Sequence, residues 1–336
     1  MKRMWMILAG AASAALAVTS APADLAAQGR VTLTLASLAP EGSVWDIELR
    51  QMASEWGAIS GGRVRLQVAP GGRLGTDSQI ITQLRAGVRP EAAALTTGLG
   101  LLDEGYNVFS LPFFFGSLAE ISAVADALEP VLARRLDAQG LTFLAWGFGG
   151  WVHIFSKAEI ASIAELKKAR LFTSAGDSAF ENWYRRNGFT PVPLSQTDIA
   201  ASLASGGINA MPAPPYAALV FQWYRETPYM LDVELTPLMG AIVVNTGAWN
   251  RVPADIRAKL VESAKALEKR LEQKIPTQDL EAVKEMQQRS LRVLKPAADF
   301  AATSRPLVES MRGALVPNDI YDLAVKARDG YRQARR

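Results

Sequence analysis

The chain has 336 residues, of which 49% are hydrophobic and 21% charged, and its 36 basic and 33 acidic residues give a net charge of +3. This apolar content is typical of a globular protein long enough to form two lobes. The absence of cysteine excludes disulfides and a cysteine nucleophile. Basic residues are interspersed with acidic ones, as in residues 268–272 (EKRLE), so the sequence lacks the basic stripe of a nucleic-acid-binding protein.

The N-terminus has the pattern of an export signal. Lys2 and Arg3 precede an uncharged apolar run at residues 4–18. A membrane-spanning helix needs roughly 20 apolar residues, whereas the core of a signal peptide needs about 7 to 15. We therefore expect residues 1–27 to be a signal peptide, cleaved after position 23 or 27, and the mature chain to be periplasmic without inserting into the membrane. The alternative is a retained N-terminal anchor.

Hydrophobic periodicity predicts strands that alternate with helices. Residues 31–35 (VTLTL) alternate as a strand does, and Trp45, Leu49, Met52 and Trp56 then recur at helical spacing. Repetition of this unit predicts an α/β architecture with a second α/β lobe. The other predicted strands are 64–68, 92–96, 141–146, 170–173, 190–192 and 241–245, and the other predicted helices are 77–86, 118–136, 163–168, one after 177, one from 197, and a long one from 254 that continues past Pro276.

The sequence offers little that favours catalysis. His153 is the only histidine, it lies in an apolar run, and no serine has the G-x-S-x-G context of a nucleophile elbow. Residues 147–150 (GFGG) lack the third glycine of a dinucleotide loop, because position 152 is valine. Asp177 fits a helix cap better than a ligand group. We expect a protein that is not an enzyme and has no cofactor; an exported enzyme with a cleft carboxylate is the remaining alternative.

Several segments together resemble the solute-binding proteins of tripartite ATP-independent periplasmic (TRAP) transporters, the DctP family. The resemblance extends over nearly the whole mature chain and depends on the order and spacing of short motifs. They are 35–40 (LASLAP), 60–64 (SGGRV), 70–75 (PGGRLG), 111–115 (LPFFF), 164–167 (AELK), 191–194 (PVPL), 203–208 (LASGGI) and 249–253 (WNRVP).

The resemblance implies a two-lobed periplasmic-binding-protein fold with a ligand cleft between the lobes and a long helix that crosses both. It also implies capture of a small organic ligand by lobe closure and delivery to the TRAP membrane permease subunits. We expect one lobe to comprise residues 28–150 plus about 240–275, and the other 151–239 plus about 276–336. The binding component of an ATP-driven importer is the alternative within the same mechanism.

The chain departs from the family at the arginine that usually clamps a ligand carboxylate. Phe172 occupies that position, Val152 lies near a second family arginine, and Ala213 lies near a cleft asparagine. Removing one partner of a buried charge pair costs about 3–5 kcal/mol. We therefore predict an aromatic or amphipathic ligand, or an organic acid bound without the usual arginine.

The candidate ligand-binding residues are aromatic or neutral, and none of them is expected to hold a metal. Thr96 and Asn245 end predicted strands, where ligands of open α/β sheets bind. For Trp45, Trp151 and Phe172, packing within the core of a lobe is the alternative, and the prolines near Pro214 could instead start a helix. The complete set is Trp45, Thr96, Thr97, Trp151, Phe172, Thr173, Pro214, Tyr216 and Asn245.

Overall fold

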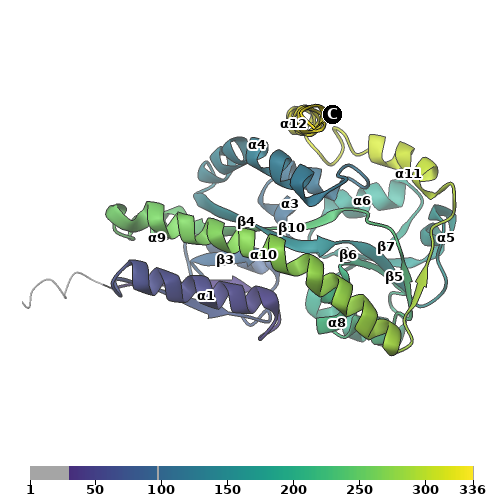
Figure 1. Cartoon of the computed structure of the whole chain (residues 1–336), viewed down its shortest axis with the longest axis horizontal. Coiled ribbons are helices and arrows are strands. Elements are labelled where there is room, and N and C mark those ends of the chain that lie inside the picture. The colour runs from purple at the N-terminus through teal and green to yellow at the C-terminus, as the bar shows by residue number, and fades with distance from the viewer. Residues whose placement is uncertain (1–29, 97, 336) are drawn as a thin grey trace, which may run out of the picture.

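The computed structural model describes residues 30–96 and 98–335, and its strands form two separate sheets (Figure 1). The predicted signal peptide and the candidate Thr97 lie outside the described residues. Within the described part of the chain, every helix is too short or too polar to cross a membrane.

The five-stranded sheet has the order β2-β1-β3-β10-β4. Strand β1 pairs in parallel with both β2 and β3, whereas β10 runs antiparallel to β3 and β4. Its strands are β1 Val31–Ser37, β2 Val64–Ala69, β3 Ala92–Leu95, β4 Leu141–Trp151 and β10 Pro237–Asn245. The helices of this half are α1 Val44–Ile59, α2 Asp77–Arg85, α3 Leu99–Leu102, α4 Leu118–Asp137 and α9 Thr246–Asn250, with α12 Asn318–Gln333 packed on α4.

The six-stranded sheet has the order β11-β9-β5-β8-β6-β7. Its first strand along the chain, β5, directly follows β4. Its strands are β5 His153–Ser156, β6 Arg170–Ser174, β7 Thr190–Leu194, β8 Ala210–Ala213, β9 Tyr229–Leu231 and β11 Arg292–Leu294. The helices of this half are α5 Ile163–Lys168, α6 Ser178–Arg186, α7 Ile199–Ser205, α8 Pro215–Val220 and α11 Phe300–Glu309.

Short polar side chains fix where the helices begin. The Ser43 hydroxyl accepts a hydrogen bond from the amide of Asp46 at the start of α1, and the Asp177 carboxylate accepts one from the amide of Phe180 at the start of α6. Each satisfies an amide that has no partner within its helix. The interpretation of Asp177 as a helix cap is thus confirmed, and α8 begins at Pro215 as the proline pattern allows.

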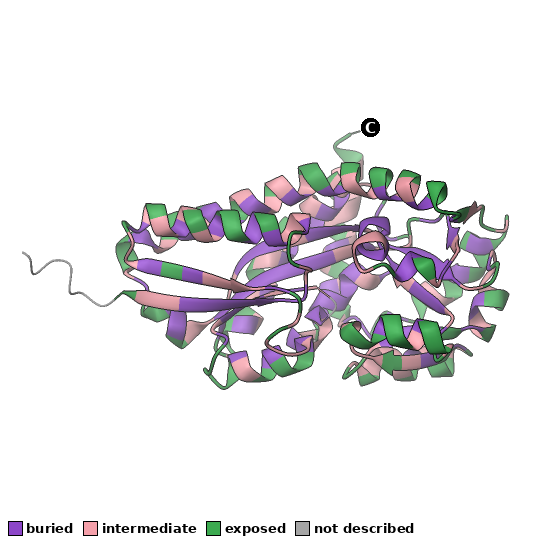
Figure 2. Cartoon of the chain, turned by 90° about the horizontal axis from the view of Figure 1, so that it is seen from below, coloured by how far each residue is buried: buried purple, intermediate pink, exposed green. Residues whose placement is uncertain are grey.

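The core lies between the strands and the inward faces of the helices. In Figure 2 the strands are largely buried, whereas exposed residues follow the outer helix faces. Trp56 of α1 is 1% exposed, its ring packs 5.6 Å from that of Trp249, and its indole donates a hydrogen bond to the carbonyl of Leu260. This tryptophan therefore attaches α1 to α9 and to the next helix, which begins at Ala254.

Four segments connect the two halves, and the last of them along the chain, residues 310–317, joins α11 to α12. One is the β4–β5 junction, and another is the segment between β9 and β10. They are hydrogen-bonded to each other, because the amide of Val152 donates to the carbonyl of Thr236 (2.8 Å) and that of Leu235 donates to the carbonyl of Val152 (2.9 Å). The third is α10, Ala254–Gln288, a 35-residue helix that runs through Pro276. It is the long green helix that passes both sheets in Figure 1, and it packs on α1, β4 and α8.

Candidate ligand-binding site

A cavity of about 340 Å³ lies where the two halves meet. Its wall includes Ser37 at the end of β1 and Leu95 at the end of β3, both from the five-stranded sheet. Thr173 of β6 and Ala213 of β8 contribute from the six-stranded sheet. The carboxyl ends of parallel strands thus face the cavity from both sides, which is where ligands bind in open α/β sheets.

Five of the predicted residues line this cavity together: Trp45, Thr96, Phe172, Thr173 and Pro214. Phe172 is 8% exposed and belongs to the continuous hydrophobic core. It therefore packs within its half and also contributes to the cavity wall, so that the two interpretations of this residue coincide.

Two further predicted residues lie beside the cavity, but their side chains are not in its wall. The Tyr216 hydroxyl accepts a hydrogen bond from the amide of Val44 (3.0 Å), and its ring lies 5.1 Å from that of Trp45. Trp151 is half-buried against the core, and its amide is hydrogen-bonded to the carboxylate of Asp279. Tyr216 thus connects the start of α1 to α8, which belongs to the other half.

Asn245 lies away from the cavity, contrary to its place among the candidates. It caps α9 by accepting a hydrogen bond from the amide of Ala248 (2.9 Å), and its side-chain amide donates to the carbonyl of Leu84 (3.0 Å). Because β10 runs antiparallel to β3, its carboxyl end lies beside the beginning of β3, where Val244 pairs with Ala92. The prediction that Asn245 binds ligand because it ends a strand is therefore wrong about its place: Asn245 lies at the edge of the sheet opposite to the cavity.

Among the residues that the structure describes, no basic residue lines the cavity. Asp177 is the only charged one of these wall residues, and the other polar ones carry hydroxyl or amide groups. Burial raises the pKa of Asp177, opposed by the hydrogen bond from the amide of Phe180, and the nearby charge of Glu104 raises it further. Burial, together with Asp177, also raises the pKa of Tyr184 to about 12. The cavity is therefore apolar with one acidic position.

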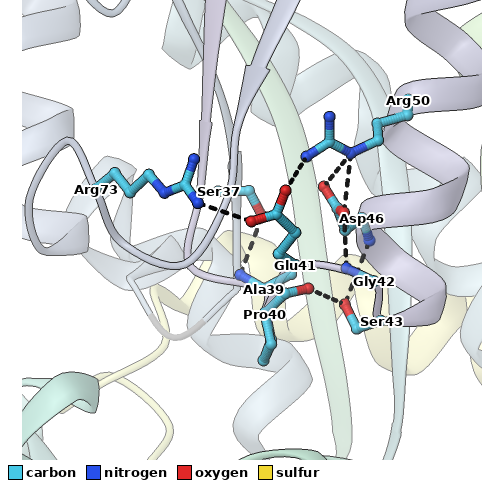
Figure 3. A network of polar contacts seen from close by, with 9 residues as sticks. All are labelled: Ser37, Ala39, Pro40, Glu41, Gly42, Ser43, Asp46, Arg50 and Arg73. Carbon is cyan, nitrogen blue, oxygen red and sulfur yellow. Dashed lines mark hydrogen bonds and ion pairs between the residues drawn. The ribbon is translucent and has the colours of Figure 1, made fainter.

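Two arginines near the β1–α1 loop, Arg50 of α1 and Arg73 after β2, are paired with acidic residues of this part of the chain (Figure 3). Arg50 binds Asp46 at 2.9 Å and Glu41 at 3.3 Å, and Arg73 binds the other oxygen of Glu41 at 2.7 Å. Neither arginine is in the cavity wall. These ion pairs hold the loop that precedes Trp45, and they leave the two guanidinium groups engaged with protein carboxylates.

His153 has a structural environment. It is 8% exposed in β5, its ring Nδ1 lies 3.3 Å from the carbonyl of Leu231, and it is not in the cavity wall. Burial lowers its pKa, opposed by the Leu231 carbonyl and by the charge of Asp232. A neutral, hydrogen-bonded imidazole in a strand supports the interpretation of His153 as a core residue.

The family to which this chain belongs follows from a match over most of its length. A model of the bacterial extracellular solute-binding protein family 7, DctP, matches residues 35–312. The chain belongs to the DctP family. It is thereby placed among solute-binding proteins and not among enzymes, as the sequence predicts.

The chain is also similar to individual proteins over part of its length. The chain is 28% identical over 152 residues to the protein YiiZ of Salmonella typhimurium, an alignment that covers 44% of this chain and 46% of that protein. The first three curated relatives are matched over only 46–62% of their own lengths.

Two solved structures support the fold. One is DctP7, an extracytoplasmic solute receptor of Bordetella pertussis that binds pyroglutamic acid. It aligns with a TM-score of 0.80 and 20% identity, and the alignment covers 89% of this chain and 99% of that one. The other is a sugar acid binding protein of Advenella mimigardefordensis in complex with galactonate, which aligns with a TM-score of 0.83 and 17% identity over 90% of this chain and 99% of that one. They confirm the predicted α/β periplasmic-binding-protein fold.

This DctP-family cavity also contains residues that sequence reasoning missed. Phe180, Trp183 and Tyr184 of α6 line it, as do Phe113 and Phe300. The α6 residues have a sequence signal, because positions three and four apart share one face of a helix. Phe113 has none: its backbone has a positive φ of 58°, and its ring meets that of Phe300 only through the tertiary fold.

Proposed function

We propose that the chain is the periplasmic solute-binding protein of a TRAP-type secondary transporter. In this role it captures a small organic ligand and delivers it to the membrane permease. The observation that supports the proposal is the cavity of about 340 Å³ whose wall comes from both halves of a DctP-family chain. Export to the periplasm through the predicted signal peptide belongs to the same proposal.

Capture would occur by closure of two lobes. The proposed limits are residues 28–150 plus about 240–275 for one lobe, and 151–239 plus about 276–336 for the other. Within the last range, α12 departs from this division because it packs on α4 of the first lobe. A ligand that touches both lobes binds the closed form better than the open form and shifts the population towards it. Exposed residues of both closed lobes would then contact the permease subunits.

The apolar wall favours an aromatic or amphipathic ligand. Burial of about 200 Å² of apolar ligand surface contributes on the order of 5 kcal/mol to binding. An organic acid would have to bind without an arginine, because Phe172 lies in the wall and none of the wall residues in the described part of the chain is basic.

The test is native mass spectrometry of the mature protein purified from its own periplasm, followed by denaturation and identification of the released compound. We expect one small organic molecule per chain. Ala217 lines the cavity and is buried, so Ala217→Phe should abolish retention by filling the space. Ala58→Phe, on the exposed face of α1, is the matched control. A second experiment adds small-molecule extracts of the source cell to the purified protein. If the protein then showed neither a bound compound nor a decrease in its radius of gyration, the proposal would be wrong.

Tyr216→Phe should weaken ligand binding about fivefold. Its hydroxyl accepts the amide of Val44 across the two halves, and a typical hydrogen bond contributes about 1 kcal/mol. Only the closed form would lose this bond, so the free energy of the closed form would rise relative to the open form by about 1 kcal/mol. Calorimetric titration with the identified ligand measures the change.

The control for this prediction is Tyr229→Phe. The Tyr229 hydroxyl meets Arg292 on the surface of the six-stranded sheet and should not influence closure. Equal dissociation constants for Tyr216→Phe and the unmodified protein would contradict a role of the bond in closure.

A further inference from the structure

One face of α6 combines a carboxylate with aromatic rings. Asp177 precedes the helix, and Phe180 and Tyr184 follow at positions i+3 and i+7, so that the three residues share one side of the helix. All three line the cavity, as does Trp183. The rings of Phe180 and Tyr184 lie 6.3 Å apart, and those of Trp183 and Tyr184 lie 5.2 Å apart.

The carboxylate of Asp177 has no basic partner among the described residues of the cavity wall, which include no lysine, arginine or histidine. Its Oδ1 accepts the hydrogen bond from the amide of Phe180 at 3.1 Å. The start of a helix normally attracts anions, but here the protein's own carboxylate already uses the amide. A ligand carboxylate at this position would face Asp177 and the field of Glu104 without a compensating cation.

The cavity wall outside α6 is largely apolar. Residues of α5, β6, α11 and the turn that includes Phe113 belong to it, and none of them contributes a charged side chain there. The apolar side chains of these elements include Ile163, Leu166, Leu171, Phe300 and Leu307. A ligand that fills the cavity therefore needs an apolar body.

We propose that the cargo is an organic amine with an apolar body, whose protonated nitrogen is held by Asp177 and by the aromatic faces of α6. The inference rests on the proposed function and names the ligand class of the same site. A protonated nitrogen forms a charge-assisted hydrogen bond to a carboxylate, and aromatic faces attract cations most strongly where water is excluded. An amine therefore satisfies both the acidic position and the rings, which an alcohol of the same skeleton does only in part.

The first part of the test identifies the charge of the compound that the protein retains from its own periplasm. An amine supports the inference, whereas a carboxylic acid without a basic nitrogen overturns it and leaves the proposed function intact. If the protein retains no compound and its radius of gyration responds to no small-molecule extract, both proposals fail.

The second part compares 3-phenylpropan-1-amine, 3-phenylpropan-1-ol and 3-phenylpropanoic acid by calorimetry on the mature protein freed of ligand. The amine should bind at least about tenfold more tightly than the acid, with the alcohol between them. Asp177→Asn should remove most of the advantage of the amine, and Asp177→Glu should preserve it. Asparagine also caps helices well, so the variant should fold.

Asp198→Asn is the matched control, because Asp198 is exposed and lies outside the cavity wall in the same half. It should leave all three affinities unchanged. Three results would overturn the inference: an acid that binds as tightly as the amine, an amine affinity that Asp177→Asn does not change, or no binding of the amine.

Discussion

Glu48→Gln should lower the free energy of unfolding by about 3 kcal/mol. Glu48 of α1 is 0% exposed, and its two oxygens each accept a hydrogen bond from α10, one from Arg270 and one from Lys274. Removing one partner of a buried ion pair costs about 3–5 kcal/mol. We take the lower end because Lys274 is 50% exposed on its side chain and Arg270 keeps Glu55. Urea unfolding at pH 7 measures the loss.

Acidification provides a second measurement on the same residue. Burial alone would raise the pKa of Glu48, but the hydrogen bonds and charges of Lys274 and Arg270 outweigh it, and the pKa is lowered. The stabilisation is therefore complete above the pKa of an unfolded glutamate, about 4.3, and is lost as the pH falls through the lower pKa of the folded state. The difference in the free energy of unfolding between the unmodified protein and Glu48→Gln should therefore shrink as the pH falls through this range.

Glu41→Gln is the control for this ion pair. Glu41 also binds two basic side chains, Arg50 and Arg73, but its side chain is 60% exposed. Exposed pairs contribute about 0–1 kcal/mol. Equal losses for Glu41→Gln and Glu48→Gln would show that the burial of Glu48 has no energetic role.

Asp279→Asn should change the pH dependence of stability in the sense opposite to that of Glu48→Gln. Burial raises the pKa of Asp279 to about 7, opposed by the amides of Tyr216 and Trp151, and the charge of Glu234 raises it further. Between about pH 4 and 7 the folded state then holds more protons at this group than the unfolded state, so the contribution of Asp279 to stability falls as the pH rises. A shift of about three units corresponds to about 4 kcal/mol, which solvent access to this half-buried group reduces to about 2 kcal/mol.

The measurement is urea unfolding at intervals from pH 4 to 8. The stability of the unmodified protein minus that of Asp279→Asn should fall by about 2 kcal/mol up to pH 7 and then stay level. Glu268 also has a pKa raised to about 7 by burial, but it remains in both proteins and largely cancels in the difference. Glu281→Gln, exposed on the same helix, should give a flat difference. Parallel curves for Asp279→Asn would contradict the prediction.

Most strands and helices could be predicted from the sequence because local patterns determine them. The apolar repeat of Trp45, Leu49, Met52 and Trp56 places α1, which spans Val44–Ile59. Residues 118–136 correspond closely to α4, Leu118–Asp137. In these elements the period of the hydrophobic residues and a capping hydroxyl indicate the same structure.

The cavity could be predicted only in part, because strand direction and tertiary contacts are absent from a local pattern. Asn245 ends a strand as Thr96 does, yet the antiparallel direction of β10 places it at the opposite edge of the sheet. Phe113 reaches Phe300 across 187 positions of the chain through a turn with positive φ. Neither placement follows from periodicity, since each depends on which segments become neighbours after folding.

Two of the connecting segments, the β4–β5 junction and the segment between β9 and β10, are hydrogen-bonded to each other, which would restrict how the two halves move. The amides of Val152 and Leu235 join these segments by two backbone bonds. Sliding one segment along the other would break both bonds, whereas flexing the pair together as a ribbon would keep them. In the proposed closure, the relative motion of the two halves would thereby be reduced towards a single rotational degree of freedom, and each cycle of opening and closing would return the two cavity walls to the same register.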